Sequence, residues 1–313
     1  MGFPNDSGHP DYSGLLAPTI WSPRVLEKYY EFSVLEHIAN TDYEGEIRKY
    51  GDKVNIRLRP DIEIKDYQAG QELDLQRPDQ PMTELVIDRG KYWNFLVEDV
   101  NLAQSDLNYL EEWTSDAAEA MNETINETVL SVIPGQVAAA NQGANAGIRT
   151  GYFNLGTVAS PIDISAANAV DILASCSAVL SEQKNPESGR WMTIPPWFKS
   201  MIFQSSIRNS LIEGNDQALL RKGHIGHLAG FELFETNQLS MAGNPAITSI
   251  TFGHIKSLTF ASQLVNSEVI RSERMFGRFA RGLNVYGFNT VRPEGMGLLR
   301  CKLAGATPTP TPT

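Results

Sequence analysis

Apolar and polar residues alternate along three runs in the first third of the chain: residues 53–59, 83–88 and 92–97. Alternation of this kind predicts strands that bury one face. Ile62 and Ile64 continue the first alternation beyond Pro60, and a polar segment, residues 66–81, separates the first run from the second. The pattern therefore predicts a long β-hairpin. Because a two-stranded hairpin alone is only marginally stable in water, it must lie on another surface, which a second copy supplies if the chain's own core does not.

The hydrophobic pattern takes the period of a helix over residues 105–133. Ser105 is a favourable N-cap residue, Asp106 suits the positive end of the helix dipole, and Pro134 with Gly135 ends the pattern. One face carries Leu107, Leu110, Trp113, Ala117, Ala120, Met121, Ile125, Thr128 and Val132. At ~1.5 Å per residue this helix would span roughly 40 Å. That length exceeds the usual helix and suits a scaffolding element.

The remainder of the chain mixes both patterns, which predicts an α+β fold. Further helices are expected at 24–39, 165–182 and 197–212, and strands at 190–194 and 231–234, with strands, turns and one helix at most from 248 to 303. Residues 136–150 consist mostly of small side chains and are interpreted as a linker.

Neither end of the chain shows hydrophobic periodicity. Residues 1–23 are rich in glycine and proline, which predicts an extended arm with a few apolar anchors. Residues 306–313 are Thr-Pro repeats and predict a stiff extended tail. The start lacks the basic and apolar regions of a signal peptide, and no run reaches the ~20 apolar residues of a membrane span. We therefore expect a protein that stays in the cytoplasm where it is made.

Composition places the chain among globular proteins. Hydrophobic residues make up 42 % and charged residues 20 %, which is too apolar for global disorder. The only cysteines are Cys176 and Cys301, and two buried thiols in a reducing compartment are favoured over a bridge between them.

Charge is distributed unevenly along the chain. The net charge is −11, with +4 in residues 266–303 and −15 in the rest. A protein with a negative net charge does not bind nucleic acid over its whole surface. Attraction between its basic and acidic regions can, however, steer copies of the chain together. Four arginines of the basic region would share one face of a helix: Arg271, Arg274, Arg278 and Arg281. They form either a solvated face with local salt bridges or a patch that faces a subunit or DNA.

The sequence offers little catalytic chemistry. His224 and His227 have a metal-ligand spacing, but the surrounding glycines argue against a helix, and His254 is the only further candidate ligand nearby. Because metal sites need three or four ligands, structural or surface histidines are favoured over a metal-dependent enzyme. The glycine spacings match neither a dinucleotide nor a phosphate loop, and no nucleophile elbow occurs. We expect no catalytic residue, cofactor or metal.

The order of the segments resembles the major capsid protein of tailed bacteriophages, whose fold is named after bacteriophage Hong Kong 97. The resemblance covers about residues 24–303. It is carried by Gly51–Ile56, Tyr67–Gly70, Gln76–Pro78, Thr83–Asp88, Lys91–Phe95, Glu98–Val100, Gln104, Arg190–Pro196, Gly223–Gly226, Gly230-Phe231, Glu273–Gly277, Gly282–Gly287 and Arg292-Pro293.

The resemblance implies a division into domains and an assembly. It implies an N-terminal arm (1–44), an extended β-hairpin loop (45–98), a peripheral domain with the spine helix (99–154 and 266–303), an α/β axial domain (155–265) and a Thr-Pro tail (304–313). The expected function is self-assembly into the pentamers and hexamers of an icosahedral head around double-stranded DNA. The predicted contacts between subunits are Leu15, Leu16, Trp21, Tyr67, Leu73, Leu75, Arg77, Arg271, Arg274, Arg278 and Arg281.

The resemblance also implies partners. We expect many copies of the chain itself, a portal protein, packaged DNA bound without sequence specificity, decoration or cement proteins in some cases, and no membrane. The sequence shows no built-in scaffold before the arm, so a separate scaffolding protein is expected. The alternative to a phage capsid protein is an encapsulin, a bacterial shell protein of the same fold that encloses enzymes. A metal-dependent enzyme using His224 and His227 is a more remote alternative.

Overall fold

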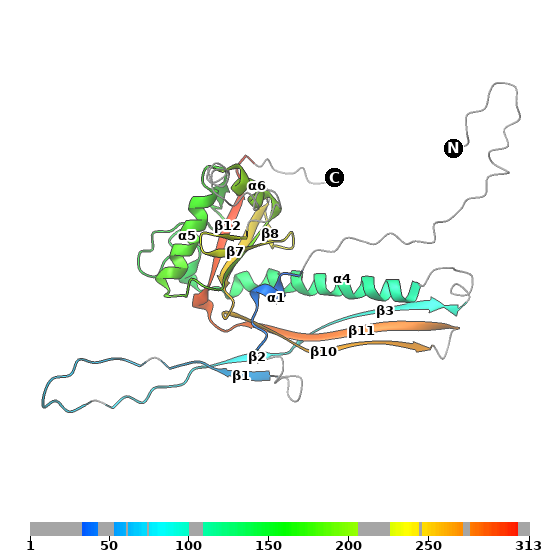
Figure 1. Cartoon of the computed structure of the whole chain (residues 1–313), viewed down its shortest axis with the longest axis horizontal. Helices are drawn as coiled ribbons and strands as arrows, with labels where there is room; N and C mark the ends of the chain where they lie inside the picture. The colour runs from blue at the N-terminus through cyan, green and yellow to red at the C-terminus, as the bar shows by residue number, and fades with distance from the viewer. Residues whose placement is uncertain are drawn as a thin grey trace, which may run out of the picture.

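The structure is a computed structural model that describes residues 33–42, 53–60, 62–73, 75–99, 109–205, 226–243, 246–271 and 276–305. Its described part is elongated (Figure 1). An α/β body lies beside a long sheet that carries one long helix, and a narrow hairpin projects away from both.

The elongated part is a three-stranded antiparallel sheet with a helix along one face. The strands are β3 (Arg89–Glu98), β10 (Leu258–Arg271) and β11 (Gly277–Thr290), in the order β10–β11–β3. Helix α4 (Tyr109–Val132) runs along this sheet (Figure 1). Trp113 of α4 meets Phe95 edge-on, with 5.8 Å between ring centroids. Because side chains alternate along a strand, Phe95 and its neighbours of the same parity face the helix.

The predicted hairpin is confirmed. Strands β1 (Lys53–Arg57) and β2 (Met82–Val86) pair in antiparallel fashion. Ile56 and Leu85 are buried in a small core at the base, where the hairpin meets the ends of β10 and β11. The carbonyl of the last β2 residue comes so close to Gly287 that a Cβ there would lie 2.1 Å from its oxygen. Only glycine at this position allows the hairpin base to press against β11.

A seven-stranded mixed sheet forms the α/β body, in the order β4–β12–β9–β5–β7–β6 with β8 paired to β9. Its strands are β4 (Ile162–Ile164), β5 (Arg190–Ile194), β6 (His227–Leu228), β7 (Phe231–Glu235), β8 (Met241–Ala242), β9 (Ile247–His254) and β12 (Met296–Leu303). Helices α5 (Ala169–Glu182) and α6 (Pro196–Gln204) complete the core, in which Leu173, Phe198 and Phe252 are fully buried.

A second core joins the body to the long sheet. The short helix α1 (Leu35–Ile38) and the C-terminal half of α4 pack there against Trp191, Tyr286 and Met296. Strand β5 serves both cores, because Trp191 faces this one and Met192 faces the core of the body. Three short 3-10 helices complete the described elements: η1 (Ile133–Gln136), η2 (Ala139–Asn141) and η3 (Pro293–Gly295).

The long helix and the main elements of residues 165–235 are confirmed, with shifts at their ends. The described part of the helix predicted over 105–133 is α4 followed by η1, whereas Ser105 and Asp106 lie outside the described residues. Of the helix predicted over 24–39 the described part is α1. Continuation of the hairpin strand through Ile62 and Ile64 was wrong: β1 ends at Arg57, three residues before Pro60, which lacks a backbone donor. The interpretation of 136–150 as a linker was also wrong, because η1, η2 and the fully buried Ala146 belong to the packed structure.

The predicted domain borders differ from the sheet topology at the C-terminal end. Residues 296–303 were grouped with the peripheral domain, but β12 lies between β4 and β9 in the sheet of the body. Its first four residues are all buried, which is typical of a central strand covered on both faces. The border between 265 and 266 likewise falls inside β10, a single strand of the long sheet.

Candidate assembly surfaces

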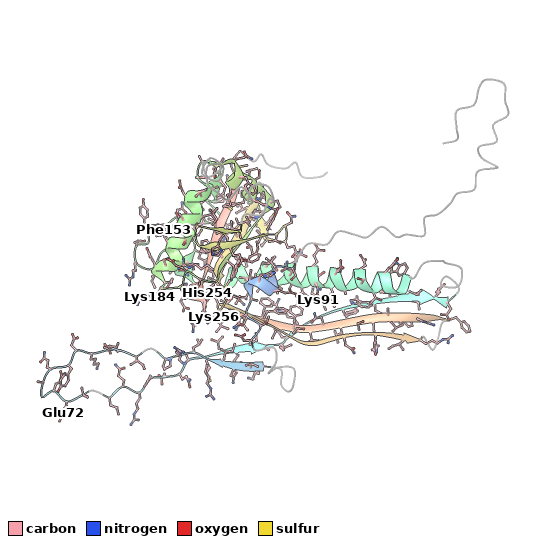
Figure 2. The ribbon with its side chains drawn as sticks, viewed as in Figure 1. Glu72, Lys91, Phe153, Lys184, His254 and Lys256 are labelled. Carbon is pink, nitrogen blue, oxygen red and sulfur yellow. The ribbon has the colours of Figure 1, made fainter. Side chains whose placement is uncertain are left out.

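The outer part of the hairpin exposes apolar side chains in two extended limbs. Near the base of the hairpin the Leu58 N–H donates to the Pro81 carbonyl at 2.9 Å. Beyond this bond the described residues of the two limbs form no strand ladder, and Ile64 and Leu75 are 94 % and 87 % exposed. Figure 2 shows Glu72 at the far end of this projection, outside the rest of the ribbon. No core of the described chain covers these side chains, so they are free to meet another molecule.

One side-chain amide holds the two limbs together. Gln76 accepts from the Glu63 backbone N–H at 3.2 Å and donates from Nε2 to the Glu63 carbonyl at 3.2 Å. The amide thus bonds to Glu63 as an opposite strand would. The hairpin keeps an extended shape at this point without a regular ladder.

The sheet face opposite α4 also exposes apolar residues. Tyr92 of β3 lies opposite Leu283 of β11, Ile270 of β10 lies on the same face of the sheet, and all three are exposed. The hairpin base covers the part of this face near Ala261, in the third core. A half-apolar sheet face of this kind is more typical of an interface than of a solvated surface.

The four arginines do not share one helical face. Arg271 lies on β10 and Arg278 and Arg281 on β11, while Arg274 lies outside the described residues. Strand alternation divides them between the two faces of the sheet. Arg281 Nε donates to Glu268 at 2.6 Å on the outer face, whereas Arg271 stands directly opposite Arg278 on the face of α4. The helical expectation was therefore wrong for the three described arginines.

Only one of the two opposed arginines has an acidic partner within the described ranges. Arg271 Nη2 lies 3.4 Å from Asp99 Oδ2, and the arginine side chain is largely exposed. Arg278 makes no ion pair with any described residue. Like charges directly opposite each other destabilise a sheet, so this end of the sheet suits an acidic partner. Phe276, 83 % exposed, adds an aromatic side chain to it.

A loop of the α/β body presents further exposed apolar residues in a fixed conformation. Ala146 and Phe153 pair with each other in an isolated antiparallel β-bridge that closes the loop. Glu182, at the end of α5, accepts hydrogen bonds from the backbone N–H groups of Arg149 and Thr150. The hydroxyl of Thr150 donates to Glu182 Oε1 at 2.7 Å, and this bond first, then the backbone bond from Arg149, holds the pKa of the Glu182 carboxyl below its usual value. The clamp holds the exposed Ile148 and Tyr152 outward.

Two buried polar side chains fix the junction between the body and the long sheet. Asn141 donates from Nδ2 to the carbonyls of Glu294 at 2.8 Å and Met296 at 2.7 Å, and accepts from Gln183 at 3.0 Å. Arg190 donates to backbone carbonyls at the end of α5, including Asn185 at 2.7 Å. Burial lowers the pKa of this guanidinium. These bonds tie η2, β12 and α5 into one body.

The described histidines and cysteines do not come together as a set of metal ligands. His227 lies on the short strand β6 and is exposed, and His224 lies outside the described residues. His254 is buried, and its Nδ1 accepts from the Lys256 backbone N–H at 3.1 Å; burial lowers its pKa. Within the described ranges no three His, Cys, Asp or Glu residues gather as a metal site. Cys176 and Cys301 are free and buried, and burial raises the pKa of Cys301 to about 12.

The family model described as phage capsid protein matches residues 83–299, which include the long sheet, α4 and most of the α/β body. The chain belongs to the phage capsid protein family. Phage capsid proteins are structural proteins of the virion shell, which is assembled from many copies, and they are not enzymes. No described helix is long and apolar enough to cross a membrane.

Solved structures show the same fold over nearly the whole chain. A structure from Mycobacterium phage Che8 has a TM-score of 0.73 at 26 % identity and covers 91 % of this chain and 97 % of its own. The capsid of Cyanophage P-SCSP1u has a TM-score of 0.66 at 14 % identity, covering 93 % and 94 %. The capsid of a native GTA particle has a TM-score of 0.62 at 12 % identity, and the match covers 92 % of this chain and 96 % of that one. No curated protein matches. The predicted Hong-Kong-97-like capsid fold is thus confirmed.

The capsid protein displays some of its predicted contact residues at one site. Tyr67, Leu73, Leu75 and Arg77 are all exposed on the outer hairpin, whereas Leu15, Leu16 and Trp21 lie outside the described residues. The exposed apolar residues that are not among the predicted contacts include Ile62, Ile64, Tyr92 and Phe276. Alternation alone could have marked Tyr92, because it has the opposite parity to Trp93 and Phe95, which face α4.

Proposed function

We propose that this phage capsid protein forms the pentamers and hexamers of an icosahedral head that encloses double-stranded DNA. The single observation that carries the proposal is the outer hairpin, whose apolar side chains lie far from every described core of their own chain. Because exposed patches of this kind mark interaction sites, the hairpin is assigned to a neighbouring subunit. Many such contacts, repeated by symmetry, make a strong shell from weak pairs.

The parts of the chain take different roles in this assembly. The α/β body, with β12 in its sheet, supplies the axial domain through which subunits meet within a capsomer. Its clamped loop with Ile148 and Tyr152 is one candidate contact. The long sheet with α4 is the peripheral domain and carries the predicted contacts Arg271, Arg278 and Arg281. The arm, residues 1–23, with Leu15, Leu16 and Trp21, reaches a further neighbour.

The proposal extends to the partners of assembly. A separate scaffolding protein directs closure in the bacterial cytoplasm, a portal protein occupies one vertex, and decoration or cement proteins bind the finished shell where they occur. DNA is held without sequence specificity. The net charge of −11 supports this part, because an acidic protein binds DNA weakly and leaves it free to be packed and released. No observation favours the encapsulin alternative; enzyme instead of DNA inside purified particles would establish it.

Deletion of residues 68–80 tests the proposal. The shortened chain is expected to keep its fold, because the hairpin base and all three cores remain, but to give soluble subunits that do not close into shells. Electron microscopy of the chain expressed alone and with its scaffolding protein measures closure. Normal particles from the shortened chain would refute the role of the hairpin.

A matched pair of substitutions removes the effect of a shorter chain. Leu73→Ser with Leu75→Ser reduces the apolar surface of the hairpin, and Met241→Ser removes an exposed apolar side chain from β8, outside the hairpin. The hairpin variant is expected to lose closed shells while the β8 variant keeps them. Thermal unfolding of the subunits should be the same for both, since none of these side chains is buried.

A further inference from the structure

The chain crosses between the α/β body and the long sheet at two turns that are bonded to each other. One turn, residues 255–257, joins β9 to β10, and the other, residues 291–295, joins β11 to β12. The Ser257 carbonyl accepts from the Val291 N–H at 2.8 Å and from the Arg292 N–H at 3.3 Å. Each turn therefore helps to fix the position of the other at the junction.

A cleft of about 450 Å³ opens beside these two turns. The connection from α5 to β5 lines it with Ser188 and Gly189, and the β9 end and the two turns line it with His254, Lys256 and Arg292. Figure 2 labels His254 and Lys256 at the edge of the body that adjoins the long sheet. A volume of this size is within the range of sites for small ligands.

The cleft carries two cations that have no counter-charge. Lys256 and Arg292 are exposed, and neither makes an ion pair with a described residue. Glu187 and Glu294 adjoin the lining in sequence but are not among the described residues that line the cleft. In a chain with a net charge of −11, two unpaired cations at one cleft favour an anionic ligand.

The buried imidazole of His254 lies in a positive field. Its Nδ1 accepts from the Lys256 backbone N–H at 3.1 Å. Burial lowers the pKa of His254 most, and a backbone hydrogen bond with Ser188 raises it. The charges of Lys256, Arg190 and Arg292 all lower it further, because like charges disfavour a second cation. The ring is thus neutral at pH 7, and the positive charge that lines the cleft belongs to the lysine and the arginine.

The two cations differ in shape, which decides the kind of anion that suits them. The lysine ammonium is a point charge with three donors, and the arginine guanidinium is a planar fork of N–H groups. A phosphate group has up to two negative charges and three acceptor oxygens, so one group can bond to Lys256, Arg292 and the Ser188 hydroxyl together. A carboxylate has one charge and two oxygens, and would leave one of the two cations without a counter-charge.

We propose that this cleft binds a phosphate group between Lys256 and Arg292 and that the bound group bridges the two crossings between the body and the long sheet. The phosphate comes from one of two sources, free inorganic phosphate or the phosphodiester backbone of DNA. Because the bound group neutralises like charges on two adjacent turns, it stabilises the junction. The inference goes beyond the proposed function, since it does not depend on any contact between subunits.

Thermal unfolding of the full-length chain as free subunits tests the site. Sodium phosphate is compared with sodium chloride at equal ionic strength, and phosphate is expected to raise the unfolding temperature to a saturating value, because it binds the folded state. Lys256→Gln with Arg292→Gln is expected to lose this rise. Arg57→Gln with Lys91→Gln removes two cations outside the cleft and is expected to keep it, which accounts for the general effect of phosphate on folded proteins.

A fluorescently labelled double-stranded oligonucleotide distinguishes the two sources. If the source is the DNA backbone, anisotropy titrations are expected to show binding about ten-fold weaker for the cleft variant than for the control variant, as the loss of one charge-assisted bond predicts. If the source is free phosphate, both variants bind the oligonucleotide alike and only their responses to sodium phosphate differ. If the two variants respond alike to both probes, the proposal is refuted.

A built-in anion gives a test that keeps both cations. Ser188 is exposed and lines the cleft, so Ser188→Glu places a carboxylate there without disturbing a core. This variant is expected to unfold at a higher temperature than the unsubstituted chain in sodium chloride and to respond less to the probe that the unsubstituted chain binds. Ser188→Gln, of the same size without the charge, is expected to do neither. Identical behaviour of the Glu and Gln variants in both measurements would overturn the proposal.

Discussion

Asn141 shows how much a single buried amide contributes to the junction of this capsid protein. Its two donated bonds to the Glu294 and Met296 carbonyls join η2 to the start of β12. Asn141→Ala leaves these carbonyls without that donor, and a buried unpaired polar group costs about 1–3 kcal/mol. We expect the free energy of unfolding in urea to fall by about 3 kcal/mol, since two acceptors are affected. Asn94→Ala, on the exposed face of β3, is the control and should change it little. Equal effects of the two substitutions would contradict this role.

Composition explains why Asn141 could not be predicted. It lies in a run of alanine, glycine and asparagine that has no apolar periodicity, and such a run is typical of a linker. The fold buries the run because small side chains fit where several elements meet. Partners more than 150 residues away, around Met296, then satisfy its polar groups. Long-range bonds of this kind leave no local pattern in a sequence.

At the scale of elements, Gly287 determines how the hairpin sits on the long sheet. A Cβ there would meet backbone atoms of β2, including a carbonyl oxygen at 2.1 Å, and backbone atoms cannot rotate away. Gly287→Ala is expected to destabilise the chain by about 1–3 kcal/mol as an overpacked site, and to reduce shell formation by tilting the hairpin. Gly90→Ala is the matched control in the same sheet, because its nearest neighbours lie 3.9 Å away or more. Thermal unfolding and electron microscopy measure both effects, and identical behaviour of the two variants would refute the explanation.

Elements with a strong period were the ones that the sequence predicted well. The hairpin strands and α4 alternate or repeat over many residues, so their local pattern agrees with their tertiary surroundings. The arginines illustrate the opposite case. Spacings of three and four favour a helix, yet Arg271 and Arg278 lie opposite each other on two adjacent antiparallel strands. Apolar residues buried by the sheet outweigh the spacing of exposed charges.

At the scale of the whole molecule, charge divides the subunit into an acidic hairpin and a basic sheet end. Residues 60–81 carry a net charge of −4, and residues 266–281, at the end of the long sheet, carry a net charge of +2, so the two regions attract each other between copies. Salt screens such attraction, since the Debye length falls from about 10 Å at 0.1 M to about 3 Å at 1 M. Shell assembly, followed by light scattering, is therefore expected to need a higher subunit concentration as salt rises. Assembly that is indifferent to salt or favoured by it would show that apolar burial alone drives the contact.

Charge reversal separates this attraction from a general effect of salt. Arg278→Glu places a carboxylate where the acidic hairpin of a neighbour would approach, and Arg278 makes no ion pair with a described residue, so the isolated subunit should be unharmed. Glu63→Lys with Glu72→Lys changes the net charge of residues 60–81 from −4 to 0. Each variant alone is expected to assemble poorly, and the chain that carries both changes to recover in part, because the substituted positions of the two surfaces then carry opposite charges again. Recovery would locate the attraction between these two surfaces, while continued failure of the combined chain would exclude them as partners.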